Sequence, residues 1–180
     1  MDQLKLLFFL QTGKEVSYHE LAILLQTSTE TIQKYIQLLE QSFVIYRLPS
    51  LSRNLRKELS KKIKIYFYDL GVRNSILQNF TPINLRTDIG AIWENFCINE
   101  KIKLMQKQNR NANLYFWRTY SKQEIDYIEE ENGVMNAFEC KWNSKKKRKI
   151  PKDFINSYSK YFFNIINSEN YLEFLWDNFE

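Results

Sequence analysis

The sequence has few of the residues that interrupt regular structure or build covalent frameworks. Its 180 residues include four glycines, three prolines, two cysteines and one histidine. Because glycine and proline are scarce, there is little room for flexible linkers, and any two folded units should be closely joined. Two cysteines cannot build a disulfide framework, and no cysteine–histidine spacing predicts a zinc site. A reduced, cytoplasmic protein fits these absences best.

Long apolar runs are also missing. Residues 4–10 form an apolar run that is too short to span a membrane, contains Lys5 and follows no basic leader, so it predicts a buried helix. The only histidine, His19, has no serine or cysteine motif nearby that would make it a catalytic base. Hydrophobic residues make up 44% of the chain and aromatic residues 16%, which is enough for a packed core.

The first part of the chain has the pattern of two short helices followed by two strands. Ser17 and Glu20 have capping-box spacing, and a second helix is expected to begin after Ser28 and to bury Ile32, Ile36 and Leu39. Residues 43–48 and 63–68 read as paired strands. We therefore expect a winged helix-turn-helix domain over residues 1–69. The basic connection 53–62 would suit a phosphate backbone.

The second helix of this unit does not have the surface of a DNA-reading helix. Its exposed positions include two acidic residues, Glu30 and Glu40, beside Gln33, Lys34 and Gln37. A recognition helix normally presents basic and amide side chains to the major groove. Sequence-specific reading of DNA is therefore not expected, and docking against a neighbouring domain is the alternative.

Asn132-Gly133 predicts a β-hairpin further along the chain. An Asn-Gly pair between alternating strand residues is the strongest short signal for a two-residue hairpin loop. Counting outward from that loop places Asp126 opposite Glu139 and Glu124 opposite Lys141. Opposed residues have Cβ atoms roughly 5 Å apart on one face, so two carboxylates should converge there.

Two facing carboxylates repel each other, and the arrangement is costly unless a cation, a shared proton or Lys141 compensates. A bound divalent ion is the most economical of these. Magnesium prefers oxygen ligands, often one or two carboxylates with water and phosphate oxygens. We expect Asp126 and Glu139 to hold it, with Lys141 orienting an attacking water, so these three are the expected catalytic residues. The alternative is an exposed hairpin in which Glu124 and Lys141 form an ordinary ion pair.

A helix is expected to open at Gly90, upstream of this hairpin. Its apolar stripe comprises Ile92, Phe96, Ile98, Ile102 and Met105. Glu94 lies near the edge of that stripe and is the third expected magnesium ligand. The alternative for Glu94 is a glutamate on the solvated surface of the helix.

The strongest basic run follows the hairpin directly. The formal net charge of the chain is +5, and five consecutive cations are Lys145, Lys146, Lys147, Arg148 and Lys149. Cations beside a metal site would hold a DNA backbone, with affinity falling as salt rises. The alternative is a solvated loop before a helix that starts at Pro151.

Five short motifs resemble a known family. They are Tyr66-Phe67-Tyr68-Asp69-Leu70-Gly71, Trp93-Glu94-Asn95-Phe96, Phe116-Trp117-Arg118-Thr119, Glu124-Ile125-Asp126-Tyr127 and Phe138-Glu139-Cys140-Lys141. Together they are similar to the carboxy-terminal region, domain of unknown function 4143, of a prokaryotic AAA-type ATPase family. An early helix with a glutamate, a strand with an aspartate and a Glu-x-Lys on the next strand also resemble the PD-(D/E)XK nuclease superfamily, here as Glu94, Asp126, Glu139 and Lys141.

The resemblance implies a fold and an order of domains. It implies an α+β or α/β chain in which the winged helix precedes a restriction-endonuclease-like domain, here residues 70–180, with a mixed sheet and flanking helices. It also implies an ATP-binding module at the amino-terminal side of the winged helix. Arg118, within one of the shared motifs, would contact phosphate.

Two features depart from the family pattern. Gly13-Lys14 is followed by Glu15, lacks an upstream glycine and has no Ser or Thr to hold magnesium, so this chain is not expected to hydrolyse ATP. Beside the family, the chain therefore looks like a carboxy-terminal fragment or a stand-alone remnant, and an ATPase module would have been lost in cis or would act in trans. The nuclease-like signature also has no clear proline before its aspartate.

Two hypotheses follow for the whole chain. The first is a magnesium-dependent DNA endonuclease. The second is a non-catalytic module of an ATPase that binds DNA or docks onto a protein.

Overall fold

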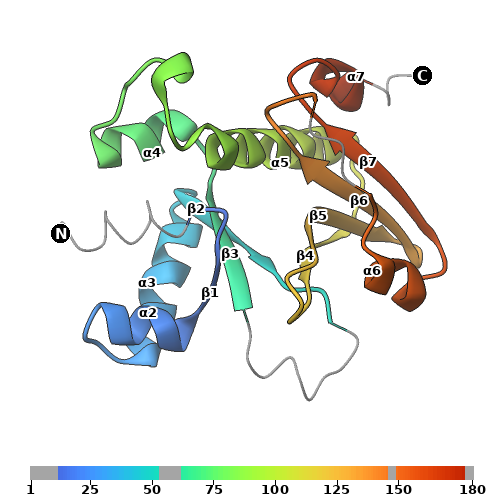
Figure 1. Ribbon diagram of the computed structural model, residues 1–180. Coiled ribbons are helices and arrows are strands. Elements are labelled where there is room, and N and C mark those ends of the chain that lie inside the picture. The colour runs from blue at the N-terminus through green and yellow to red at the C-terminus, as the bar shows by residue number, and fades with distance from the viewer. Residues whose placement is uncertain (1–11, 53–61, 146–148, 177–180) are drawn as a thin grey trace. The chain divides into compact units, whose positions relative to one another are not determined.

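The computed structural model describes residues 12–52, 62–145 and 149–176, and these form two compact units (Figure 1). The units are Met1–Arg86 and Thr87–Glu180. Both contain helices and a β-sheet, so the chain is a mixed α+β protein. The division between the units lies after Arg86, whereas the sequence prediction placed it after Asp69. No described helix has the length and apolar character needed to cross a membrane.

The first unit packs helices against a three-stranded antiparallel sheet. The strands run in the order β1-β3-β2. Its elements are β1 (Glu15–Ser17), α2 (Tyr18–Leu24), α3 (Thr29–Gln41), β2 (Ile45–Pro49), β3 (Lys62–Phe67), α4 (Leu70–Leu77) and the 3-10 turn η1 (Ile83–Leu85).

Local capping determines where the first two helices begin. The Ser17 hydroxyl accepts the Glu20 amide at 3.1 Å, and the Glu20 carboxylate accepts the Ser17 amide at 2.7 Å, which completes the predicted capping box of α2. Ser28 caps α3 by accepting the Thr31 amide at 3.1 Å. Both predicted helix starts are confirmed.

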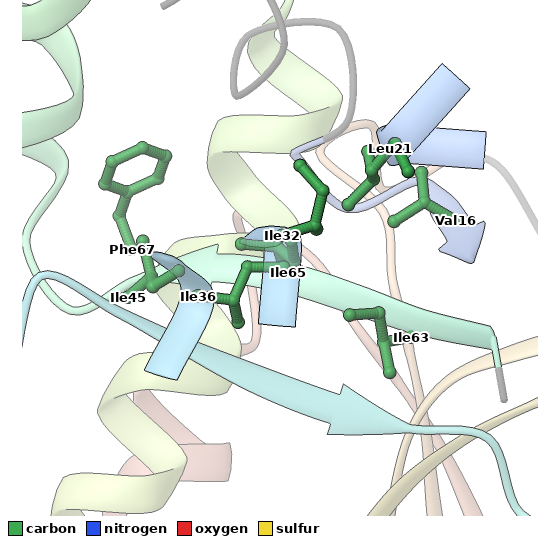
Figure 2. Close-up of a cluster of buried hydrophobic side chains, with 9 residues drawn as sticks. Val16, Leu21, Ile32, Ile36, Ile45, Ile63, Ile65 and Phe67 are labelled. Carbon is green, nitrogen blue, oxygen red and sulfur yellow. The ribbon is translucent and has the colours of Figure 1, made fainter. Parts of the chain in front are cut away.

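The core of the first unit lies between α2, α3 and the sheet (Figure 2). Ile32 and Ile36 are buried as predicted. Leu39 is only partly buried and packs against this core. The pairing of β2 with β3 confirms the two predicted strands. The predicted helix at residues 4–10 and nearly all of the basic connection, residues 53–61, lie outside the described residues.

The second unit is built on a four-stranded mixed sheet in the order β4-β5-β6-β7. Strands β4, β5 and β6 are antiparallel, and β7 is parallel to β6. Its elements are α5 (Ile89–Lys107), β4 (Asn113–Arg118), β5 (Glu124–Glu131), β6 (Val134–Cys140), α6 (Lys152–Ser157), β7 (Tyr161–Ile166) and α7 (Tyr171–Trp176).

The β5–β6 hairpin has the predicted register. Glu131 pairs with Val134 and Ile128 with Ala137. Asn132 and Gly133 form the loop with φ angles of 53° and 76°, and two successive positive φ angles characterise the primed hairpin turn that an Asn-Gly pair favours.

Helix α5 buries the predicted apolar positions Ile92, Ile98, Ile102 and Met105, whereas Phe96 is only half-buried. Strand β5 is buried continuously from Ile125 to Glu129. Both faces of this central part are therefore covered, and Asp126 and Glu129 lie inside the unit rather than on an exposed hairpin face.

Candidate active site

The candidate site lies where the ladder between β5 and β6 ends. Tyr127 and Phe138 are the last pair in the register, and Asp126 and Glu139 are the next residues outward. Here the Asp126 carboxylate takes the place of a strand partner, because its Oδ2 accepts the Cys140 backbone N–H at 3.0 Å. A side chain fixed by a backbone donor has little freedom, so the strand end orients Asp126.

Lys141 joins the two predicted carboxylates. Its Nζ lies 3.0 Å from Asp126 Oδ2 and 2.7 Å from Glu139 Oε2. The side chains of Asp126 and Glu139 are 2% and 0% exposed, and that of Lys141 is 24% exposed. The structure thus brings the three predicted catalytic residues together at one partly open ammonium group.

The charge of Lys141 is maintained by these carboxylates. Burial alone would lower the pKa of Lys141, but the negative charges of Asp126 and Glu139 outweigh burial and raise it above its ordinary value. Lys141 is therefore a cation at neutral pH. It can orient a water or a phosphate oxygen, but it cannot take a proton from water.

Cys140 lies beside the same carboxylates and is not a nucleophile. A hydrogen bond with Cys97 and burial raise the pKa of the Cys140 thiol, and the charges of Asp126 and Glu94 raise it further. A thiol held neutral is a poor nucleophile, so cysteine-based chemistry does not fit this site. The Glu94 charge that acts on Cys140 comes from α5.

The oxygen ligands fit magnesium in kind, although they do not form a three-acid cluster. Among the described residues, no three His, Cys, Asp or Glu side chains are grouped so that they could hold a metal ion. Glu94 is thus near Cys140 but is not joined to Asp126 and Glu139 in such a group. Magnesium commonly takes only one or two protein carboxylates and keeps several waters, so Asp126 and Glu139 meet that requirement.

Lys141 lies between Asp126 and Glu139, which differs from the exposed ion pair with Glu124 that the alternative expected. Glu124 pairs across the β4–β5 ladder with Arg118, whose Nε lies 3.7 Å from Glu124 Oε2. Arg118, the predicted phosphate contact, therefore already has a carboxylate beside its guanidinium group. Lys145 and Lys149 are exposed after β6, and the rest of the basic run, residues 146–148, falls in a range that the structure does not describe.

An aromatic cluster adjoins the site and has no simple signal in the sequence. The Trp93 ring contacts the rings of Phe96, Trp142 and Tyr171 at centroid distances of 5.6, 5.2 and 5.5 Å. Its indole N–H donates to the Ile166 carbonyl at 3.5 Å. The residues come from α5, α7 and the segment after β6, so only the tertiary fold brings them together. The position of Trp142 directly after Lys141 was the one sequence clue.

Comparisons with known proteins divide the chain at nearly the same place as the structure. Residues 89–171 match the family described as domain of unknown function (DUF4143), and four of the five motifs that resembled this family lie within them, whereas the motif at residues 66–71 lies outside. Residues 1–82 match a separate family, domain of unknown function (DUF8612).

Two curated relatives are uncharacterised proteins from Mycobacterium bovis and Mycobacterium tuberculosis. Each is 28% identical over 134 residues, which cover 73% of this chain and 30% of the relative. The chain therefore matches less than a third of the length of these relatives. No solved structure matches the chain significantly.

Proposed function

We propose that this chain joins a winged helix to a PD-(D/E)XK nuclease-like domain and acts as a magnesium-dependent DNA endonuclease. The observation that carries the proposal is Lys141 held between the buried carboxylates of Asp126 and Glu139. Burying two carboxylates against a single cation is costly at a strand end that has only a structural role. A site that binds a divalent cation and a phosphate gives this arrangement a reason.

The order of the elements supports the assignment of the second unit. Helix α5, the antiparallel strands β4–β6, helix α6 and the parallel strand β7 form a mixed sheet with flanking helices, as the resemblance implies. Asp126 lies on the second strand, and Glu139 and Lys141 lie at the end of the third. In the first unit, two capped helices followed by the paired strands β2 and β3 support a winged helix.

Asp126 and Glu139 would hold the magnesium ion, and Glu94 of α5 is proposed as the third ligand. A bound magnesium ion would neutralise charge on a phosphodiester and lower the pKa of a coordinated water. Lys141 stays charged, so it would position the water or a non-bridging phosphate oxygen. In the reaction the coordinated water would release a proton to solvent, its oxygen would bond to phosphorus, the bond to the leaving sugar oxygen would break, and that oxygen would take up a proton from solvent.

Cleavage of supercoiled DNA in magnesium tests this function. The native chain is compared with two variants. Asp126→Asn removes the charge of one expected magnesium ligand, and Lys141→Ala removes the ammonium group. We expect nicking by the native chain and a loss of at least about a hundredfold in each variant, the range of losing one electrostatic contact in a transition state.

A matched control separates chemistry from folding. Glu130→Gln changes a carboxylate on the same strand that bonds to Asn113 and lies away from the site, so it should cleave at the native rate. Circular dichroism checks that each variant is folded. Equal nicking by the native chain and both site variants would exclude the catalytic proposal.

Docking of the first unit is a second candidate, and a specific observation favours it over DNA reading. Four large apolar side chains on its two helices are exposed by more than half: Ile23, Leu24, Tyr35 and Leu38. Such a surface suits a protein partner better than a phosphate backbone. The proposed partner is an ATP-binding module, because the resemblance implies one and the Gly13-Lys14 segment lacks the phosphate-loop residues. Charged substitutions at Tyr35 and Leu38 should abolish association with such a module and leave DNA cleavage unchanged.

A further inference from the structure

The residue after Lys141 is an exposed tryptophan whose position is fixed. Strand β6 ends at Cys140, but the Lys141 backbone N–H still donates to the Ile166 carbonyl of β7 at 2.8 Å. The chain therefore leaves the sheet at Trp142, immediately beside the candidate site. The Trp142 side chain is 36% exposed.

A buried aromatic group supports the Trp142 ring. Trp93 is 6% exposed, and its ring meets Trp142 with an interplanar angle of 73° and a centroid distance of 5.2 Å. Trp93 is itself held by the Ile166 carbonyl and by the rings of Phe96 and Tyr171. In a T-shaped contact the two rings are not stacked face to face, so this contact leaves at least one face of Trp142 uncovered.

The charges around Trp142 suit a nucleotide. Lys141 precedes it, and the exposed Lys145 follows three residues later, with the Lys145 amide held by Asn143 Oδ1 at 2.9 Å. A hydrogen bond of 2.6 Å between Ser144 and Glu169 ties the same segment to the loop after β7. A flat apolar ring between cations can bind a base by stacking while the cations bind its phosphates.

We propose that Trp142 is a stacking platform for an unpaired base next to the Lys141 site. Bases inside an intact duplex are stacked on both faces, so only an unpaired or terminal base can lie on such a ring. The substrate class that follows is DNA with a single-stranded segment beside the cleaved phosphate: a single strand, a flap or a frayed end. The inference rests on the proposed function, since it places the substrate at that site.

Fluorescence anisotropy with labelled oligonucleotides tests this platform in the absence of divalent metal, so that binding is read without cleavage. The ligands are a single strand, a blunt duplex of the same sequence and a duplex with a single-stranded extension. Native chain is compared with Trp142→Ala and Trp142→Phe, the latter keeping a ring. Phe162→Ala is the matched control, because Phe162 on β7 is a 65% exposed aromatic residue outside the cluster.

We expect Trp142→Ala to weaken binding of the single strand and of the extended duplex about tenfold, in line with the loss of one stacked base. Binding of the blunt duplex should change less than about twofold, and Trp142→Phe should retain most of the affinity. Phe162→Ala should bind as the native chain does. Equal affinity of Trp142→Ala and native chain for the single strand would overturn the proposal, as would an equal loss for single strand and blunt duplex.

The outcome separates this inference from the nuclease proposal. Metal-dependent cleavage with no effect of Trp142→Ala on single-strand binding overturns the platform and leaves the nuclease standing. A Trp142-dependent affinity for single strands without cleavage in magnesium supports the platform and overturns the nuclease. Absence of binding to all three oligonucleotides overturns the platform.

Discussion

Lys141 is the side chain on which the electrostatics of the site depend. Asp126 and Glu139 are almost fully buried, and the Lys141 ammonium lies within 3.0 Å of both. Removing one partner of a buried ion pair leaves an uncompensated charge and costs about 3–5 kcal/mol. For Lys141→Met we expect a loss of about 2–4 kcal/mol at pH 7, less than for a fully buried cation because 24% of the side chain is exposed. Urea unfolding measures it.

The effect of Lys141→Met should depend on pH. Without the ammonium, one of the two facing carboxyl groups is expected to take up a proton as the pH falls, which relieves their repulsion. The destabilisation should therefore shrink between about pH 7 and pH 4.5. Lys145→Met, an exposed lysine on the same segment, is the control and should stay within about 0.5 kcal/mol of native stability. A loss of equal size in both variants would contradict the assignment.

Glu129 is a third buried carboxylate, outside the candidate site. Its Oε2 lies 3.4 Å from the Arg110 guanidinium, whereas its Oε1 has no hydrogen-bond partner within the described part of the chain. Burial raises the pKa of Glu129, and the positive charges of Lys101 and Arg110 only partly oppose this. The folded chain thus binds the Glu129 proton at a higher pH than the unfolded chain does.

The raised pKa of Glu129 predicts the sign of a pH effect on stability. Since the folded state holds more protons, the free energy of unfolding should fall as the pH rises from the ordinary value of 4.5 through the folded pKa. Glu129→Gln cannot titrate, so its stability should vary less over that window, while Arg110 keeps its 2.6 Å pair with Glu131. Urea titrations at several pH values check this, with Glu130→Gln as control. If the free energy of unfolding of Glu129→Gln varied with pH as steeply as that of the native chain, the prediction would be wrong.

At the residue scale, the sequence predicted the members of the site that depend on local register. Asp126, Glu139 and Lys141 could be placed because a two-residue loop determines every pair of the hairpin. The contacts of Trp142 and the pairing of Glu129 with Arg110 could not be predicted, because their partners come from distant elements. Arg118 was predicted as a phosphate contact, and its neighbour Glu124 was found only in the structure.

The turn of the β5–β6 hairpin is the element that sets the geometry of the site. Gly133 has φ of 76°, and a Cβ added there would meet no atom within 4 Å. The cost of Gly133→Ala is therefore one of backbone conformation alone, and we expect a loss of about 1–2 kcal/mol. Because slippage of the register would separate Asp126 from Glu139, any cleavage activity should fall with it. Thermal unfolding measures the stability change.

Gly90 offers the matched control for that substitution. It lies in the first turn of α5, where a Cβ would also meet nothing within 4 Å, and its φ is not in the left-handed region. Gly90→Ala should raise stability by up to about 1 kcal/mol, since alanine loses less conformational entropy in a helix. A similar change from both substitutions would mean that the turn conformation does not matter.

Elements whose ends are set by residues close in the sequence could be predicted, and pairings set by distant residues could not. Capping side chains lie three residues from the amides that they bind, so the starts of α2 and α3 were readable from Ser17 and Ser28. The parallel pairing of β7 with β6 has no local signal, because the two strands are joined through α6 and the register is set by packing. The burial of both faces of β5 could not be predicted either, because it too depends on the packing of other elements.

For the whole molecule, the division between the units was the hardest feature to predict. Helix α4 follows β3 after the Asp69 cap, and its residue Ile76 packs against the core of the first unit. A single short helix does not reveal from its sequence which core it joins. The prediction therefore ended the first unit before α4, whereas the structure includes it.

Two exposed lysines of this basic chain, Lys145 and Lys149, predict how DNA binding should depend on salt. Lys145 and Lys149 are exposed beside the site. If each neutralises one phosphate of a single strand, replacing both by Gln should make the slope of log affinity against log salt shallower by about 1 to 1.5. Lys103→Gln with Lys107→Gln removes the same charge from exposed positions of α5 and should leave the slope unchanged. Equal slopes in the two double variants would contradict contact through Lys145 and Lys149.

The central claim is that Asp126 and Glu139 form a divalent-cation site, and its most direct test needs no knowledge of the substrate. The unfolding temperature of the native chain and of Asp126→Asn is followed as magnesium is added at constant ionic strength. A ligand that binds only the folded state stabilises it in proportion to the logarithm of its concentration above the dissociation constant. We predict a rising unfolding temperature for the native chain and none for Asp126→Asn. The same rise in both proteins, or no rise in the native chain, would contradict the claim.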